Sequence, residues 1–130
     1  MAEIGNAWGL VLIVEDEPQL RRFAAQVLRR IGFEVLVAME GSDGVRLVRE
    51  HRDELRAVIL DHQMPGMDGL DTLKTLRREF PQLPVVMMSG APQDEWAANI
   101  GPDPALLFLQ KPFTVPELQQ TVERAAAMKA

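Results

Sequence analysis

Several charged or hydroxyl side chains come directly at the end of short apolar runs in this sequence. The first run leads into two acids, the third ends in an acid, the fourth ends in a serine, and a lysine lies just past the fifth: Glu15, Asp16, Asp61, Ser89 and Lys111. In open α/β sheets, ligands bind outside the carboxyl ends of the strands. We therefore expect these side chains to meet at one edge of a sheet, although they lie far apart in the sequence.

The three acids predict a divalent cation at this edge. Two carboxylates about 4 Å apart repel each other by roughly 4 kcal/mol at an effective dielectric constant near 20, so three facing one another need a cation among them. The chain has no cysteine and only two histidines. The available ligands are thus hard oxygens, which favour Mg²⁺ or Mn²⁺ over zinc or copper.

The other two residues add groups that bind an anion. Lys111 offers a positive point charge and Ser89 a hydroxyl donor. Together with a metal ion they would stabilise a phosphoryl group during its transfer. Because the chain has no cysteine, an aspartate is the natural nucleophile. Asp61 ends the strand that we expect at the centre of the sheet, so we assign the attack to it.

Strand-like and helix-like segments alternate along the chain. Apolar runs typical of strands cover five segments: 10–14, 33–39, 57–61, 85–89 and 105–110. Helical spacing of apolar residues covers three more, 18–31, 41–51 and 70–80, and resumes after Thr114. A fourth helix is limited to residues 93–100 at most, because prolines flank this segment.

Polar residues suited to helix starts support these boundaries. Ser42 or Asp43 could cap the second helix. Asp68 could serve the turn or the start of the third. Thr114, with Glu117 three positions later, forms a capping-box pattern at the start of the last helix.

The strands are apolar throughout, which is typical of a parallel sheet covered by helices on both faces. The sequence therefore predicts a doubly wound α/β fold with five strands and a shortened fourth helix. We expect a single domain over residues 10–127, preceded by a tail of residues 1–9.

Composition excludes several classes of protein. Among 130 residues, no apolar run approaches the roughly 20 that a membrane helix needs. The N-terminus shows no secretion signal, and the absence of cysteine suits a reducing cytoplasm. The net charge of −5 argues against a nucleic-acid partner for this domain. The arginine pairs of the first helix, from Arg21 to Arg30, fit a solvated helix face.

Four segments together resemble one family. "LIVEDEP", "VILDHQMPGMDG", "MMSG" and "FLQKPF" resemble, in order and spacing, the response-regulator receiver domain of two-component signalling. By position, the resemblance implies that Asp61 is the phospho-acceptor and that Lys111 and Ser89 act with it. It also implies that Ser89 and Phe108 form the switch, and that the five strands of the α/β sheet take the flavodoxin-like order 2-1-3-4-5.

The same resemblance implies a metal site and one unusual peptide bond. Asp16, Asp61 and the main-chain carbonyl of Gln63 would coordinate Mg²⁺, with Glu15 acting partly through water. The peptide bond before Pro112 would be cis.

The implied function is that of a signalling switch rather than an enzyme. A sensor histidine kinase or phosphotransfer protein would pass a phosphoryl group to Asp61, and the face made by the fourth helix, fifth strand and fifth helix would change shape. The short fourth helix looks more like receivers of hybrid sensor kinases than like those fused to DNA-binding domains. The alternative is a receiver-like interaction module that phosphorylation does not control.

Two rivals fit the residues less well. A phosphohydrolase with an aspartyl nucleophile would need an acid two residues after Asp61, where Gln63 stands. A flavodoxin-like cofactor carrier would need glycine and hydroxyl residues in its first loop, and "EDEP" would repel a phosphate there.

Overall fold

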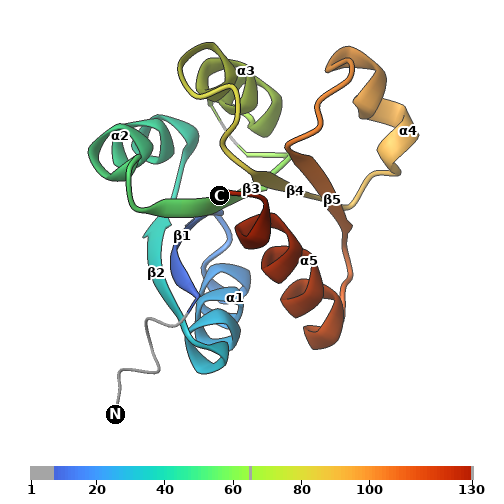
Figure 1. Cartoon of the computed structure of the whole chain (residues 1–130). Helices are drawn as coiled ribbons and strands as arrows, with labels where there is room; N and C mark the ends of the chain where they lie inside the picture. The colour runs from blue at the N-terminus through green and yellow to red at the C-terminus, as the bar shows by residue number, and fades with distance from the viewer. Residues whose placement is uncertain (1–7, 65, 130) are drawn as a thin grey trace.

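The computed structural model describes residues 8–64 and 66–129. Within these residues, the strands form one parallel sheet in the order β2-β1-β3-β4-β5 (Figure 1). In chain order they are β1 (Gly9–Val14), β2 (Phe33–Ala38), β3 (Leu55–Asp61), β4 (Val85–Ser89) and β5 (Leu106–Gln110). The predicted fold class and strand order are confirmed.

Helices cover both faces of this sheet. On one face α1 (Pro18–Ile31) packs beside α5 (Val115–Met128), and on the other α2 (Gly41–His51) packs beside α3 (Gly69–Glu79) (Figure 1). The fourth helix is short, as predicted: α4 (Gln93–Trp96) continues only as the 3₁₀ turn η2 (Ala97–Asn99).

The core has two halves, one on each face of the sheet. Leu12 and Val14 of β1 belong to the half beneath α2 and α3, whereas Val11 and Ile13 belong to the half beneath α1 and α5. All four side chains are fully buried, which explains why this strand is apolar at every position. Each such burial stabilises the fold by about 1.5–3 kcal/mol, so the central strands hold their ends in fixed places.

Most of the predicted helix starts are correct. Thr114 and Glu117 form the capping box: the Thr114 hydroxyl accepts from the Glu117 N–H at 3.2 Å, and the Glu117 carboxylate accepts from the Thr114 N–H at 2.8 Å. Asp68 caps α3 by accepting from the Asp71 N–H at 2.9 Å.

The predicted cap of α2 is wrong. The N-cap residue is Glu40, and its side chain makes no capping hydrogen bond. The Ser42 hydroxyl donates to the Glu40 carboxylate at 3.0 Å. Ser42 lies inside the helix, so its hydroxyl hydrogen-bonds to a neighbouring side chain and does not accept from the free N–H groups of the first turn.

Some boundaries also differ from those expected. β3 begins at Leu55, two residues before the predicted apolar run. Arg56 hides this start in the sequence, because it is an exposed residue of the strand, and its guanidinium donates to the Lys129 carbonyl at 2.7 Å. β1 begins at Gly9 and α5 ends at Met128, each one residue beyond the predicted domain bounds of 10 and 127. Residues 1–7 of the predicted tail lie outside the described residues.

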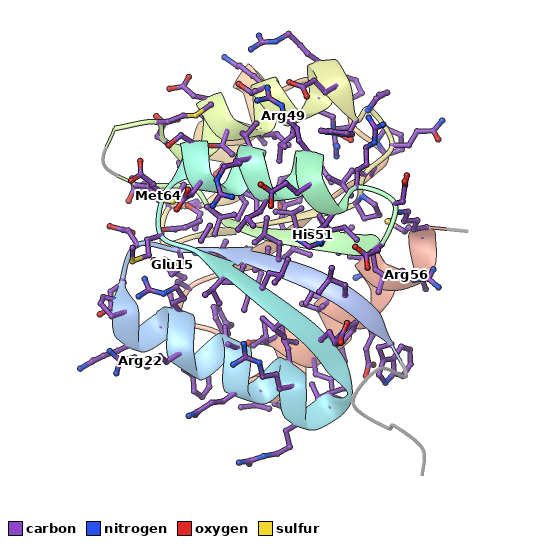
Figure 2. All side chains as sticks on the ribbon, turned by 90° about the vertical axis from the view of Figure 1, so that its left-hand side faces the viewer. Glu15, Arg22, Arg49, His51, Arg56 and Met64 are labelled. Carbon is purple, nitrogen blue, oxygen red and sulfur yellow. The ribbon has the colours of Figure 1, made fainter. Side chains whose placement is uncertain are left out.

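The two ends of the sheet carry different side chains. Glu15 and Met64 lie at the end where the strands finish, and Arg56 lies at the opposite end (Figure 2). None of the helices in the described part of the chain is both long and apolar enough to cross a membrane.

Candidate functional site

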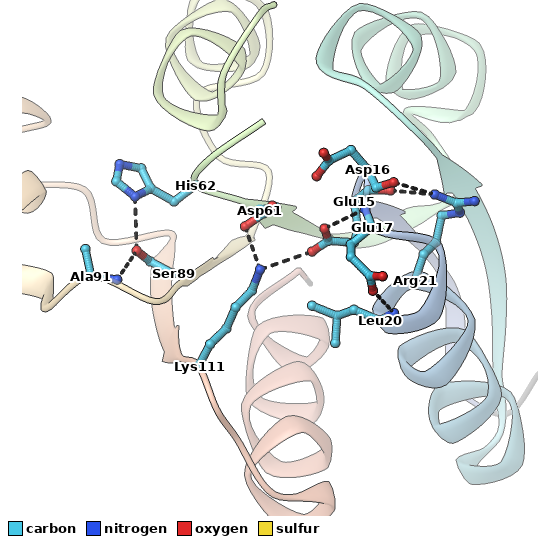
Figure 3. A network of polar contacts seen from close by, with 10 residues as sticks. All are labelled: Glu15, Asp16, Glu17, Leu20, Arg21, Asp61, His62, Ser89, Ala91 and Lys111. Atoms are coloured by element: carbon cyan, nitrogen blue, oxygen red, sulfur yellow. Dashed lines mark hydrogen bonds and ion pairs between the residues drawn. The ribbon is translucent and has the colours of Figure 1, made fainter. Parts of the chain in front are cut away.

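The strand order brings acids from two separate loops together. β1 and β3 are neighbours in the sheet and run parallel, so Glu15 and Asp16, which follow β1, lie beside Asp61 at the end of β3 (Figure 3). Lys111 follows β5 and reaches the same place with its long side chain (Figure 3). The sheet thus gathers four of the residues singled out in the sequence.

Lys111 contacts two buried carboxylates. Its Nζ donates to Asp61 Oδ1 at 2.9 Å and to Glu15 Oε1 at 3.4 Å. Only 3% of Asp61 and 1% of Glu15 is exposed. Because a buried carboxylate without a partner is strongly destabilising, the Lys111 ammonium stabilises the fold as well as placing positive charge beside Asp61.

Glu15, Asp16 and Asp61 form an acidic cluster. One carboxylate oxygen from each lies within 4.8 Å of the other two. Asp16 is at least partly exposed, so the cluster opens to solvent. When ionised, these three carboxylates exceed the single positive charge of Lys111, and the donor set of hard oxygens fits Mg²⁺.

Burial has the largest effect on the pKa of Glu15. Burial raises the pKa of Glu15 from 4.5 to about 7, against the lowering effect of the Glu17 backbone N–H. That N–H donates to Glu15 Oε2 at 3.0 Å. The negative charge of Asp61 raises the pKa further, and Lys111 lowers it. A divalent ion beside the cluster would favour the ionised carboxylate, so the charge of the site suits a divalent cation.

Lys111 keeps its proton in this environment. Burial lowers its pKa, but the hydrogen bond and charge of Asp61 and the charge of Glu15 outweigh burial and raise the pKa above 10.5.

The Lys111–Pro112 peptide bond is cis, as the resemblance implies.

The loop that carries the first two acids is fixed by α1. Arg21 Nη1 donates to the main-chain oxygens of Glu15 at 2.9 Å and Asp16 at 3.3 Å. Glu17 caps the helix by accepting from the Leu20 N–H at 2.6 Å. The predicted solvated arginine face is therefore wrong for Arg21. Nothing in the sequence separates it from its exposed neighbour, because both lie on the polar side of the helix.

Gly69 allows the chain to pass close behind Asp61. A Cβ on Gly69 would lie 2.2 Å from the Asp61 carbonyl oxygen and 2.6 Å from His62 Cα. The Gly69 N–H also donates to the His62 carbonyl at 2.9 Å. Any side chain here would push against the backbone that holds the Asp61 carboxylate. In the sequence, the "DG" at the start of the third helix indicates a turn, but it does not reveal this contact.

Ser89 ends β4 beside the site but its hydroxyl is bonded elsewhere. Its Oγ lies 3.0 Å from His62 Nδ1 and accepts from the Ala91 N–H at 3.0 Å (Figure 3). Only 2% of Ser89 is exposed. The sequence suggested no partner for His62. Its place directly after β3, next to the end of β4, was the signal that could have supplied one.

Gln63 and Phe108 each line a hollow near these residues. Gln63 is exposed in the loop after β3 and lines a hollow with His62, Met64 and Asp68. Phe108 is half-buried in β5, packs against the core beneath α2 and α3, and lines a small hollow that Ser89 also lines.

Comparison with known proteins identifies the family. The family model for the response regulator receiver domain matches residues 11–123. The chain is similar to the sensor kinase CckA of Brucella abortus, with 34% identity over 113 residues, covering 87% of this chain and 12% of that protein. It is also similar to the transcriptional activator protein PfeR of Pseudomonas aeruginosa, with 41% identity over 111 residues, covering 83% of this chain and 34% of that protein.

The fold agrees with the sequence match. A response regulator receiver domain protein from Clostridium thermocellum has a TM-score of 0.85 and 26% identity, with coverage of 93% of this chain and 96% of that one. The chain spans about a third or less of CckA and PfeR. These two relatives have different outputs, a kinase and a transcriptional activator, so the similarity concerns the domain they share. The chain belongs to the response regulator receiver domain family.

Proposed function

We propose that this domain is the phospho-acceptor of a two-component phosphorelay in the cytoplasm. In this proposal Asp61 takes a phosphoryl group from the phosphohistidine of a sensor histidine kinase or a phosphotransfer protein. The observation that carries it is the Asp61 carboxylate, which is buried at the end of the central strand, 2.9 Å from the Lys111 ammonium and within a cluster of acids.

Asp61 is the nucleophile of the transfer. One of its carboxylate oxygens attacks the phosphorus atom in line with the P–N bond of the phosphohistidine. The new P–O bond forms as the P–N bond breaks, and the imidazole leaves with the electron pair. Lys111 neutralises negative charge on the phosphoryl oxygens. The product is an acyl phosphate on Asp61, held on a signalling domain rather than turned over by an enzyme.

The acidic cluster is the metal site in this proposal. Asp16, Asp61 and the main-chain carbonyl of Gln63 would hold Mg²⁺, and Glu15 would act partly through water. Bound there, the ion would supply positive charge to the phosphoryl oxygens. The excess of carboxylates over cations in the cluster supports this assignment.

Ser89 and Phe108 would carry the change to the surface. The Ser89 hydroxyl turns to donate to a phosphoryl oxygen, and Phe108 turns into the space it leaves. Two observations support this pair: both residues line the same hollow, and the pairing of Ser89 with Gln110 places Phe108 on the same face of the sheet. The face formed by α4, β5 and α5 then changes shape for a partner.

The test is incubation with a small phosphodonor, such as phosphoramidate, with and without Mg²⁺. Intact mass should show one phosphoryl adduct that needs the metal and is absent from Asp61→Asn. Asp53→Asn, an exposed aspartate before β3, is the matched control and should be phosphorylated as the wild type is. An adduct that survives in Asp61→Asn would contradict the assignment. A wild-type protein that takes no phosphoryl group would favour an interaction module that phosphorylation does not control.

A further inference from the structure

The hydrogen bond between His62 and Ser89 has no part in the transfer reaction itself. His62 Nδ1 and Ser89 Oγ are 3.0 Å apart, and the same Oγ accepts from the Ala91 N–H at 3.0 Å. Both partners lie on the side of Ser89 turned away from Asp61 and Lys111 (Figure 3). Before phosphorylation, therefore, two contacts hold the switch hydroxyl away from the reactive carboxylate.

The backbone of β3 places His62 for this contact. The His62 N–H donates to the Met88 carbonyl at 2.7 Å, which extends the pairing of β3 with β4 by one step and puts His62 beside Ser89. Successive side chains of an extended chain point to opposite sides. Asp61 therefore points toward Lys111, and His62 points to the other side, where Ser89 lies (Figure 3).

The chemistry of a hydroxyl makes this contact compete with switching. Ser89 has one proton to donate, and the proposed switch needs that proton on a phosphoryl oxygen. If His62 Nδ1 accepts from Ser89, the proton is already in use. If Nδ1 carries a hydrogen, it donates to Oγ, which is then anchored by two donors. In either tautomer the contact holds Oγ on the side away from Asp61, so it opposes movement of the hydroxyl toward a phosphoryl group.

We propose that His62 is a positioning residue of the switch, which holds Ser89 in its unphosphorylated position and so lowers the fraction of molecules in the switched form. This inference rests on the proposed function, because it acts only through a Ser89 that turns toward a phosphoryl group on Asp61. When a phosphoryl group occupies the site, the His62–Ser89 hydrogen bond has to break. The free energy of breaking this bond reduces the observed affinity for the phosphoryl group. Removal of the bond should therefore tighten binding of a phosphoryl group or its analogue.

A beryllium fluoride complex, which has the shape and charge of a phosphoryl group, provides an equilibrium test. It is titrated in the presence of Mg²⁺ and followed by ¹⁹F NMR. His62→Leu removes the polar atom but keeps a bulky side chain, and we expect about three- to tenfold tighter binding from the loss of one hydrogen bond. His62→Asn keeps a polar atom at the δ position, so we expect binding close to that of the wild type.

A second background separates this role from a merely structural one. In Ser89→Ala the hydroxyl is gone, so His62→Leu should add no further change in affinity. Thermal unfolding of each unliganded variant reports any loss of stability separately. The inference is overturned if His62→Leu binds the complex no more tightly than the wild type, or if the gain persists in the Ser89→Ala background. A wild-type protein that neither binds the complex nor accepts a phosphoryl group overturns the proposed function, and this inference with it.

Discussion

The Lys111 ammonium lies 2.9 Å from the Asp61 carboxylate although 50 residues separate them in the chain. The same ammonium also contacts Glu15, 96 residues away. Because the three groups come from the ends of three parallel strands, only the folded sheet brings them together. At such distances the charge of each group affects what the other two can bind.

Replacement of Lys111 by alanine should affect metal binding and phosphoryl transfer in opposite directions. The cluster loses its nearest positive charge, so Mg²⁺ should bind about tenfold more tightly or better, since a unit charge about 4 Å away contributes up to roughly 4 kcal/mol at an effective dielectric constant near 20. Phosphorylation should slow by about 100-fold, because the charge that stabilises the phosphoryl oxygens is lost. Calorimetric titration with Mg²⁺ measures the change in metal affinity. The rate of adduct formation, followed by intact mass, measures the change in phosphoryl transfer.

The exposed Lys74 of α3 provides the control for this experiment. Lys74→Ala changes the net charge by the same amount but lies away from the acidic cluster, so both measurements should stay close to the wild type. Weaker Mg²⁺ binding in Lys111→Ala would show that the lysine organises the metal site rather than opposing the ion.

In the metal-free protein, Glu15 should make stability fall as pH rises. Its pKa is about 7 in the folded chain and near 4.5 when unfolded, so the folded state binds this proton more tightly. The resulting stabilisation is complete below pH 4.5 and is lost as pH rises through 7, by up to about 3 kcal/mol. Urea unfolding in a chelator between pH 5 and 8 measures this slope. Saturating Mg²⁺, which favours the ionised carboxylate, should flatten it.

Glu15→Gln tests the assignment, since the amide cannot ionise. Its metal-free stability should lack this part of the pH slope and should exceed that of the wild type at pH 8. If the slope is unchanged in Glu15→Gln, another group titrates in this range.

The fold could be predicted because apolar runs and helical spacing report burial directly. The strands β1 and β4 are buried along almost their whole length, so each reads as an apolar run. Prediction failed where a side chain departs from the general pattern. Ser42 hydrogen-bonds to Glu40 and does not cap α2. Arg56 is a charged residue within β3 and interrupts its apolar run.

The gathering of the candidate site could be predicted in part. Strand ends in a parallel sheet share an edge, which was enough to expect Asp61 and Lys111 together. The contacts of Arg21 and Gly69 could not be foreseen, whereas the place of His62 directly after β3 could have indicated its contact with Ser89. The contacts of Arg21 and Gly69 depend on which backbone passes nearby, and residue type alone does not report that.

Gly69→Ala should destabilise the fold and disturb the site, whereas Gly90→Ala should do neither. The new Cβ of Gly69→Ala would lie 2.2 Å from the Asp61 carbonyl oxygen, so the backbone must shift, at a cost of about 1–3 kcal/mol. A Cβ on Gly90, just past Ser89, would meet nothing within 4 Å. Urea unfolding measures the cost and phosphodonor labelling measures the effect on Asp61. Equal stabilities of the two variants would contradict the close contact.

Arg77 holds together three segments at the other end of α3. Its Nε donates to Asp103 Oδ2 at 2.7 Å, Nη1 donates to the carbonyls of Leu83 at 2.7 Å and Phe80 at 3.2 Å, and Nη2 donates to the carbonyl of Ala105 at 3.3 Å. The Leu83 and Ala105 carbonyls lie just before β4 and β5, the strands that carry Ser89 and Phe108. The side chains of Arg77 and Asp103 are only 18% and 10% exposed.

Arg77→Ala should therefore cost much more than loss of a surface ion pair. It leaves the nearly buried Asp103 carboxylate and several carbonyls without their partner, so we expect a loss of about 3 kcal/mol in the free energy of unfolding. Arg49→Ala is the matched control, because Arg49 pairs with Glu79 through side chains that are 55% and 36% exposed, and we expect a much smaller loss than in Arg77→Ala, since solvent screens an exposed ion pair. Urea unfolding of both variants measures the difference. Similar losses in the two would mean that solvent satisfies the Arg77 partners as readily as it satisfies Glu79.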